Sequence, residues 1–233
     1  MSNILLVLSA ADSLVLADGS THPTGFWAEE FVVAHRDLLA AGHSVTIATP
    51  GGVAPTVDAM SVDASIVGSA DKVAELAAYL DSVRGILASP VSLESASAST
   101  FAAIVLPGGH GPMTDLARDA ALGALLVEAN DRGTIIAPFC HGPAALLSAD
   151  RADGTFAFDG RRLAAFTDEE ELTGGLGDKS PWFVSAALSE RGVVLDAAPA
   201  WSSHVVIDDN LISGQNPQSS EAVARALIEA LAK

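Results

Sequence analysis

The chain has 233 residues, of which 12 are Lys or Arg and 29 are Asp or Glu, so its formal net charge is −17. A field of this sign repels phosphate backbones and anionic membrane surfaces, which excludes nucleic acid and membranes as expected partners. With one cysteine an internal disulfide is impossible, and no segment reaches the ~18 apolar residues that cross a bilayer. We therefore expect a cytoplasmic protein whose acidic excess mainly serves solubility.

The first two thirds of the chain alternate short apolar runs with helical patterns. In chain order we expect a strand in 3–10, a helix from about Thr24 to Ala41, a strand in 44–52, a helix over roughly Ala70 to Leu87, a strand in 101–109, a helix near Leu122 to Arg132 and a strand over Thr134 to Phe139. This order predicts an α/β fold, with a doubly wound, mostly parallel sheet, helices on both of its faces and right-handed crossovers.

The remaining third is expected to add hairpins. The runs TFAF and RRLAAF flank Asp159-Gly160, and HVVI and LISG flank Asp209-Asn210, both of which are favourable turn sequences. An amphipathic helix over 219–233 ends the chain. Because we find no repeat, linker or low-complexity tract, we expect a single domain over 1–233, with the hairpins and the loop 11–23 as additions to it.

The single cysteine, Cys140, ends the apolar run TIIAPF and is followed by His141, Gly142 and Pro143. A strand that turns sharply into a helix exposes the turn residue above the sheet, where the unpaired N–H groups of the helix start create a positive potential. This is the geometry of a nucleophile elbow, and it predicts a thiol pKa well below ~8.5. The alternative is an inert buried thiol, the usual state of a lone cysteine at a strand end.

A second loop, LPGGHGPMTDL at 106–116, also leaves a predicted strand. Gly108 and Gly109 allow the backbone to approach a ligand closely, and ligands of doubly wound sheets lie over the carboxyl ends of the strands. The N–H groups of Gly109 and His141 are therefore candidates for an oxyanion hole over the thiol. His110 is a candidate pocket residue, although a loop histidine is more often polar surface. No cysteine, histidine and acid spacing indicates a metal site.

Several stretches together carry a family resemblance. LPGGHGPMTDL followed by FCHGPAALL is similar to the PfpI superfamily of the class I glutamine amidotransferase-like fold, and resembles its branch of glyoxalase III enzymes and heat-shock chaperones. TGFWAEEF, TPGG, FTDEEE and WSSHVVIDDNLISGQNPQSS extend the resemblance over nearly the whole chain. It implies a flavodoxin-like sheet and, as is usual in the family, a homodimer.

The resemblance also implies two acidic partners. The acid of the first long helix that contacts the cysteine falls on Glu30, which leaves Glu29 as a solvated surface charge. The acid that orients His141 falls on Glu171 of Phe-Thr-Asp-x-x-Glu, with the register open within 169–171. For Glu169 and Glu170 we favour charges that match the dipole of a helix start.

The implied activity is that of glyoxalase III, which converts methylglyoxal to lactate or glyoxal to glycolate without glutathione, metal or cofactor. The Cys140 thiolate would attack the aldehyde to give a hemithioacetal, and Glu30 would move a proton between the two former carbonyl carbons. Contact with a thiol in a buried site should raise the pKa of Glu30. His141, oriented by Glu171, would assist proton transfers and activate water for release of the thioester.

The chain departs from the family just before the cysteine, where Pro138 and Phe139 replace the expected small or β-branched pair. We expect Phe139 to reshape the pocket wall and so to affect substrate preference. The glutaminase pattern Gly-x-Cys-x-Gly is absent, which disfavours amidotransfer from glutamine. Two alternatives remain: a stress-related holding chaperone or redox sensor, and an amidase, peptidase or protein deglycase that uses the same nucleophile.

Overall fold

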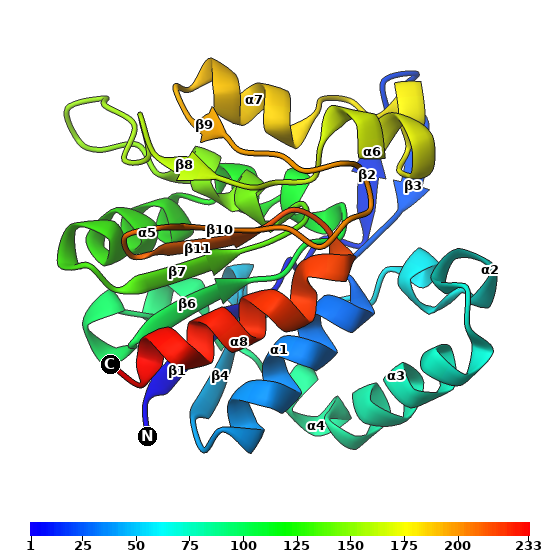
Figure 1. Ribbon diagram of the computed structural model, residues 1–233, viewed down its shortest axis with the longest axis horizontal. Coiled ribbons are helices and arrows are strands. Elements are labelled where there is room, and N and C mark those ends of the chain that lie inside the picture. The colour runs from blue at the N-terminus through cyan, green and yellow to red at the C-terminus, as the bar shows by residue number, and fades with distance from the viewer.

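The computed structural model describes residues 1–233 and contains one large sheet (Figure 1). Its seven strands are β1 (Asn3–Val7), β4 (Ser44–Thr49), β5 (Val91–Ser92), β6 (Ala103–Leu106), β7 (Ile135–Pro138), β10 (Val205–Asp208) and β11 (Leu211–Gly214). They lie in the order β10-β11-β7-β6-β1-β4-β5, and every neighbouring pair is parallel except β10 with β11. The predicted doubly wound, mostly parallel sheet is confirmed.

Helices cover both faces of this sheet (Figure 1). One face carries α1 (Ala28–Ala40), α3 (Ala70–Ser82) and α8 (Ser220–Leu231), and the other carries α5 (Ala120–Arg132) and α7 (Val184–Glu190). The central strand β1 explains the apolar run at the start of the chain. Ile4 and Leu6 pack into one apolar cluster, and Leu5 and Val7 pack into the other, because both faces of a parallel sheet are buried.

The connections contain shorter elements. The strands β2 (Ser13–Val15) and β3 (Thr21–Pro23) form a small antiparallel pair, β8 (Arg162–Leu163) and β9 (Val194–Leu195) form a parallel one, and the short helices are α2 (Ala64–Val67), α4 (Arg84–Leu87) and α6 (Asp168–Gly174). Turns of 3-10 helix lie at Pro50–Gly52, Ala59–Val62, Leu93–Ser95, Ala98–Thr100, Gly111–Met113, Leu116–Arg118, Gly142–Ser148, Gly177–Lys179 and Pro217–Ser219. No helix combines the length and apolar composition needed to cross a bilayer.

Two predicted helices differ in extent. The helix expected from Thr24 begins only at Ala28, because the preceding residues are held extended: the Thr24 hydroxyl donates to Asp58 at 2.9 Å, and Phe26 bridges to Val57. The helix expected over 70–87 is interrupted after Ser82. The Ser82 hydroxyl donates back to a backbone carbonyl of the last turn, a competing hydrogen bond that disfavours continuation of a helix.

The two hairpin predictions have different outcomes. β10 and β11 pair as expected around Asp209, which has φ 54°. The prediction of a hairpin at Asp159-Gly160 is wrong, because the chain turns earlier. Gly154 has φ 84°, and Asp150 and Phe156 form an antiparallel β-bridge. The segment after Gly160 then pairs in parallel with β9.

Arg161 accounts for the displaced turn. Its guanidinium donates to a carboxylate oxygen of Asp208 at 2.9 Å and to the side chains of Asn130 and Asn210 at 2.7 and 3.1 Å. These bonds hold the start of β8 beside the β10–β11 turn. The residues after Asp159 are therefore unavailable as the return strand of a local hairpin.

Candidate active site

Cys140 lies at the junction of β7 and the 3-10 helix Gly142–Ser148, over the carboxyl end of the sheet. Its φ of 57° is left-handed, a conformation that costs a non-glycine residue about 1–2 kcal/mol and is concentrated at functional sites. The turn is fixed on both sides: the Cys140 N–H donates to the Gly214 carbonyl at 3.0 Å, and the Cys140 carbonyl accepts from Phe166 N–H at 2.9 Å. Its side chain is 2% exposed but lines a cavity.

Glu30 reaches this thiol from the first turn of α1. The side chain is fully buried, and its Oε2 accepts the Gly108 N–H at 2.5 Å. Its Oε1 has no hydrogen-bond partner of good geometry, and the carboxyl is close enough to Cys140 for each group to shift the pKa of the other. Burial raises the pKa of Glu30 to about 8, and the hydrogen bond from Gly108 and the neighbouring Cys140 thiol act in the opposite direction.

The thiol itself differs from the sequence prediction. Burial and then the carboxyl of Glu30 raise the pKa of Cys140 above its ordinary value, so the predicted lowering of this pKa is wrong for the resting site. The backbone N–H groups of Gly109 and His141 lie near the sulfur and act in the opposite direction. Two acidic groups in contact cannot easily both ionise, so Cys140 and Glu30 share their protons as one coupled pair.

The two loop glycines have different tasks. The N–H of Gly108 donates to Glu30, so it is not free to bind a ligand. Gly109, with φ 86°, has its N–H close enough to the sulfur to lower the thiol pKa, as His141 does. A Cβ at Gly108 would lie 2.6 Å from the His141 nitrogen, and one at Gly109 would lie 2.4 Å from the Gly25 carbonyl oxygen. Both contacts require glycine.

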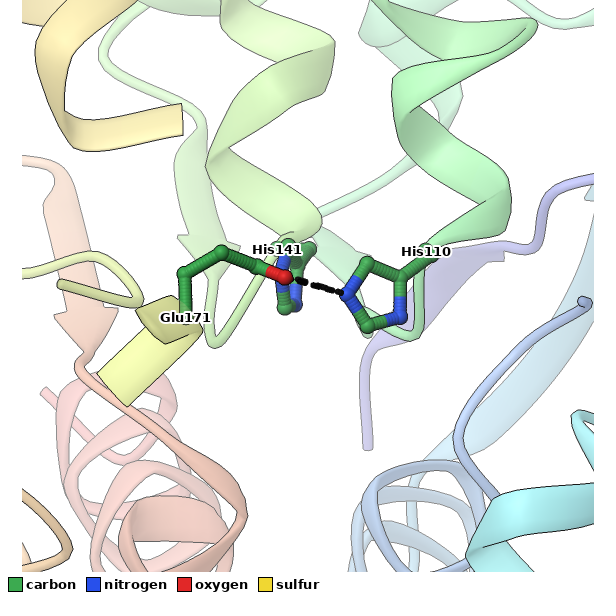
Figure 2. A group of neighbouring side chains, drawn as sticks. All are labelled: His110, His141 and Glu171. Carbon is green, nitrogen blue, oxygen red and sulfur yellow. Dashed lines mark hydrogen bonds and ion pairs between the residues drawn. The ribbon is translucent and has the colours of Figure 1, made fainter. Parts of the chain in front are cut away.

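His141 connects the thiol to an ionised carboxylate. Its Nδ1 lies 3.3 Å from the Cys140 sulfur, and its Nε2 lies 2.7 Å from Oε2 of Glu171 (Figure 2). Burial, followed by the charge of His110, lowers the pKa of His141. Burial opposes ionisation of Glu171, but hydrogen bonds from His110 and His141 outweigh it and lower the pKa of this carboxyl. A neutral imidazole oriented by a carboxylate can therefore exchange a proton with the sulfur.

His110 is a second imidazole on the same carboxylate. Its Nε2 lies 3.2 and 3.3 Å from the two oxygens of Glu171, and its ring centroid lies 4.2 Å from that of His141 (Figure 2). The side chain is buried and lines the cavity, so the polar-surface interpretation is wrong.

His110, His141 and Glu171 could also ligate a metal ion, since their ligand atoms lie within 4.8 Å of one another. Sequence spacing did not indicate this, because they come from three separate segments.

Of the remaining acids, Glu169 and Glu170 lie in the first turn of α6, as predicted, and Glu29 differs from expectation. Glu29 is not a solvated surface charge, because its side chain is 19% exposed and pairs with Lys72 at 2.6 Å beside the cavity. Glu170 is fully buried, and its carboxylate accepts hydrogen bonds from the groups Thr167 N and Oγ1, Trp201 N, Gln215 Nε2 and Asn216 Nδ2. It thereby ties the start of α6 to the loop that carries Trp201. Glu169, in contrast, is exposed.

The cavity above the thiol has a volume of about 680 Å³. Aromatic residues that the sequence did not single out line it: Trp27, Phe166 and Trp201. Phe139 is not one of them. Its ring is 1% exposed and lies in the core beneath α8, with its Cβ close to Gly214, so the predicted change to the pocket wall is wrong.

A comparison with models of protein families shows to which family the chain belongs. The model of the DJ-1/PfpI family matches residues 21–230. The chain belongs to the DJ-1/PfpI family. Membership covers all the segments that form the site, from the residues before α1 to α8, and agrees with the resemblance drawn from the two motif loops.

Similar proteins extend this assignment. The chain is 28% identical to the human glutamine amidotransferase-like class 1 domain-containing protein 1, over 92% of this chain and 91% of that one. It is 22% identical to the protein/nucleic acid deglycase HchA of Staphylococcus aureus, over 97% of this chain and 78% of that one. The solved structure of glyoxalase III from Candida albicans superposes with a TM-score of 0.82 at 21% identity, over 98% and 96% of the two chains. At that identity the last likeness shows the shared fold.

Proposed function

We propose that this DJ-1/PfpI member is a glutathione-independent glyoxalase that converts methylglyoxal to lactate, or glyoxal to glycolate, through a hemithioacetal on Cys140. One observation carries the proposal: a fully buried carboxyl, Glu30, lies close enough to the thiol for each group to shift the pKa of the other, and its own pKa is raised to about 8. A group that must both accept and donate a proton near neutrality needs such a pKa. We place this activity in the cytoplasm, where a single thiol stays reduced.

The first step is addition to the aldehyde. With one proton on the Cys140–Glu30 pair, the sulfur attacks the aldehyde carbon C1 while the Glu30 proton passes to the carbonyl oxygen. The N–H groups of Gly109 and His141, which lie near the sulfur, stabilise the negative charge that develops on that oxygen. The products are a neutral hemithioacetal and an ionised Glu30.

The second step is an internal proton transfer. The Glu30 carboxylate removes the C1 hydrogen as a proton, which gives an enediolate and protonated Glu30, and Glu30 then returns this proton to C2. As the hydroxyl proton of C1 moves to the oxygen of C2, C1 becomes a thioester carbonyl and C2 becomes an alcohol. C1 is oxidised and C2 is reduced, so the step requires no external oxidant. The Gly108 N–H holds Oε2, which leaves Oε1 for the transfer.

The last step is hydrolysis of the thioester. His141, whose Nε2 is held by Glu171, accepts a proton from the attacking water and donates it to the departing sulfur. The lowered pKa of His141 keeps the imidazole neutral and able to act as the base.

Glu171→Gln is expected to lower kcat by about 10²–10⁴-fold, because an amide no longer fixes the imidazole tautomer and orientation. Steady-state lactate formation measures this. Glu169→Gln is the matched control, since Glu169 is the exposed acid two residues away and should retain wild-type activity. Equal losses in both variants would show that the carboxylate of Glu171 has no specific part in turnover.

The activity itself is tested by incubating the purified protein with methylglyoxal, without glutathione and with a chelator present. We expect lactate in an amount equal to the methylglyoxal consumed, with a single stereochemistry at C2, because the proton is delivered to one face. Absence of lactate, with the protein folded, would overturn the proposal.

A second candidate is a protein deglycase, an activity that the name of the S. aureus relative states for that protein. It would use the same thiol on a carbonyl adduct of an amine. A redox-sensor role is less favoured, since the burial that raises the pKa of Cys140 also disfavours its oxidation. We also propose a homodimer, the commonest symmetric assembly, which light scattering in solution would test.

A further inference from the structure

The cavity over Cys140 is much larger than methylglyoxal. At about 30 Å³ per non-hydrogen atom, the volume of a liquid water molecule, such a substrate fills on the order of a fifth of the 680 Å³. The remaining space is lined by side chains of a definite character. A substituent on the ketone carbon of the substrate would extend into it when the aldehyde carbon meets the sulfur.

One wall of this space is aromatic. Phe166 and Trp201 meet edge to face, with ring centroids 5.6 Å apart and planes at 72°. Phe166 also lies against the ring of His141 at 4.3 Å, so the aromatic wall begins directly beside the reacting groups. Further apolar lining comes from Trp27 and Met60 and from the aliphatic side chains of Ile66 and Val67. α2, which carries the last two, lies on the same side of the molecule as α6 (Figure 1).

Trp201 is held in this wall at a conformational cost. Its φ of 64° is left-handed, although it is a large non-glycine residue. The buried carboxylate of Glu170 accepts its N–H at 2.8 Å, and its ring lies over Gly174, where a Cβ would come within 2.5 Å of ring atoms. Trp201 as a whole residue remains 39% exposed. A strained, anchored and partly exposed aromatic side chain is the kind of feature found where a ligand is bound.

The charges around the cavity disfavour anionic substituents. Lys72 is the one lysine or arginine of the lining, and Glu29 neutralises it at 2.6 Å. Glu221 adds a second carboxylate to the lining. A phosphate or a glutathione carboxylate would therefore find no free cation, whereas an uncharged ring would replace water against aromatic and aliphatic side chains.

We propose that the preferred substrates are 2-oxoaldehydes with an aromatic or bulky apolar group on the ketone carbon, seated against Trp201 and Phe166. This rests on the proposed function and names its substrate class. For phenylglyoxal the bonds change as for methylglyoxal. The sulfur adds to C1, the hydrogen of C1 moves to C2, and water releases mandelate.

The test is the ratio of kcat/KM for phenylglyoxal to that for methylglyoxal. We expect a ratio of about 10 or more in the wild-type protein, the usual value of an added apolar group in a fitting pocket. Trp201→Ala and Trp201→Gly should lower it about tenfold, and Trp201→Phe should keep most of it. The glycine variant also relieves the φ of 64°, so it is expected to fold. Ile207→Ala, an exposed apolar position on β10, is the control and should leave the ratio unchanged.

Two results overturn the inference. If methylglyoxal is consumed but the ratio does not respond to Trp201→Ala and Trp201→Gly, or responds equally to Ile207→Ala, the aromatic subsite is wrong and the glyoxalase activity stands. If the wild-type protein consumes neither substrate, the proposed function fails and the inference fails with it.

Discussion

Cys140→Ala is expected to abolish methylglyoxal consumption, with kcat/KM at least about 10⁴-fold below the wild-type value, because the hemithioacetal then cannot form. The cavity contains no other thiol, and the chain has no other cysteine. The substitution removes a single buried sulfur atom and leaves the backbone bonds of residue 140 to Gly214 and Phe166 in place. Lactate production and a thermal melt, measured on the same sample, check both statements.

Cys140→Gly is the companion variant. It also lacks the nucleophile, and glycine adopts the φ of 57° without strain, so it should be inactive and at least as stable as Cys140→Ala. Lactate formation by either folded variant at more than about a hundredth of the wild-type rate would contradict covalent catalysis at this residue.

Glu30→Gln is expected to lower kcat by about 10²–10⁴-fold with little change in KM, because proton transfer between C1 and C2 loses its carrier while the cavity keeps its shape. Glu29→Gln is the matched comparison one position earlier on α1. Its side chain pairs with Lys72 and does not reach the thiol, so most of the activity should remain. Steady-state kinetics on the two purified variants separate the neighbouring acids. Equal loss in both, or loss in Glu29→Gln alone, would reverse the assignment.

The raised pKa of Glu30 also predicts that the activity of the wild-type protein depends on pH. The active form of the pair carries one proton, so kcat/KM of the wild-type protein should rise as the pH passes through about 8. Stability changes in the opposite direction. Protonated Glu30 contributes to the free energy of unfolding fully below a pH of about 4.5, and this contribution is lost as the pH rises through about 8. Glu30→Gln should therefore gain stability relative to wild type in alkaline solution. Denaturant unfolding at pH values on both sides of 8 measures this gain.

The core of the site could be predicted from sequence because short segments carry it. Cys140 and His141 are adjacent, and the strand-to-helix turn that exposes them is encoded by an apolar run followed by Gly142 and Pro143. Glu30 and Glu171 could be placed only through the resemblance, since their contacts with these residues span the whole fold. The structure brings all four together, with Glu171 in the register that was predicted.

What the sequence missed depends on contacts between distant segments. The raised pKa of Cys140 comes from burial and from Glu30, neither of which is visible in the motif around the thiol. Glu170 resembles any acid at a helix start, yet its partners Gln215 and Asn216 lie about 45 residues further along the chain. The displaced hairpin has the same origin, because the bond between Arg161 and Asp208 outweighs a favourable local turn sequence.

The central claim is that Cys140 forms a covalent adduct whose onward reaction needs Glu30. The most direct measurement is carbon NMR of Glu30→Gln protein mixed with methylglyoxal labelled at the aldehyde carbon. We expect a hemithioacetal resonance that persists in this sample, that is absent from Cys140→Ala protein, and that gives way to lactate only when wild-type protein is used. Rapid conversion of the label to lactate by Glu30→Gln, or an adduct that also forms on Cys140→Ala protein, would contradict the central claim.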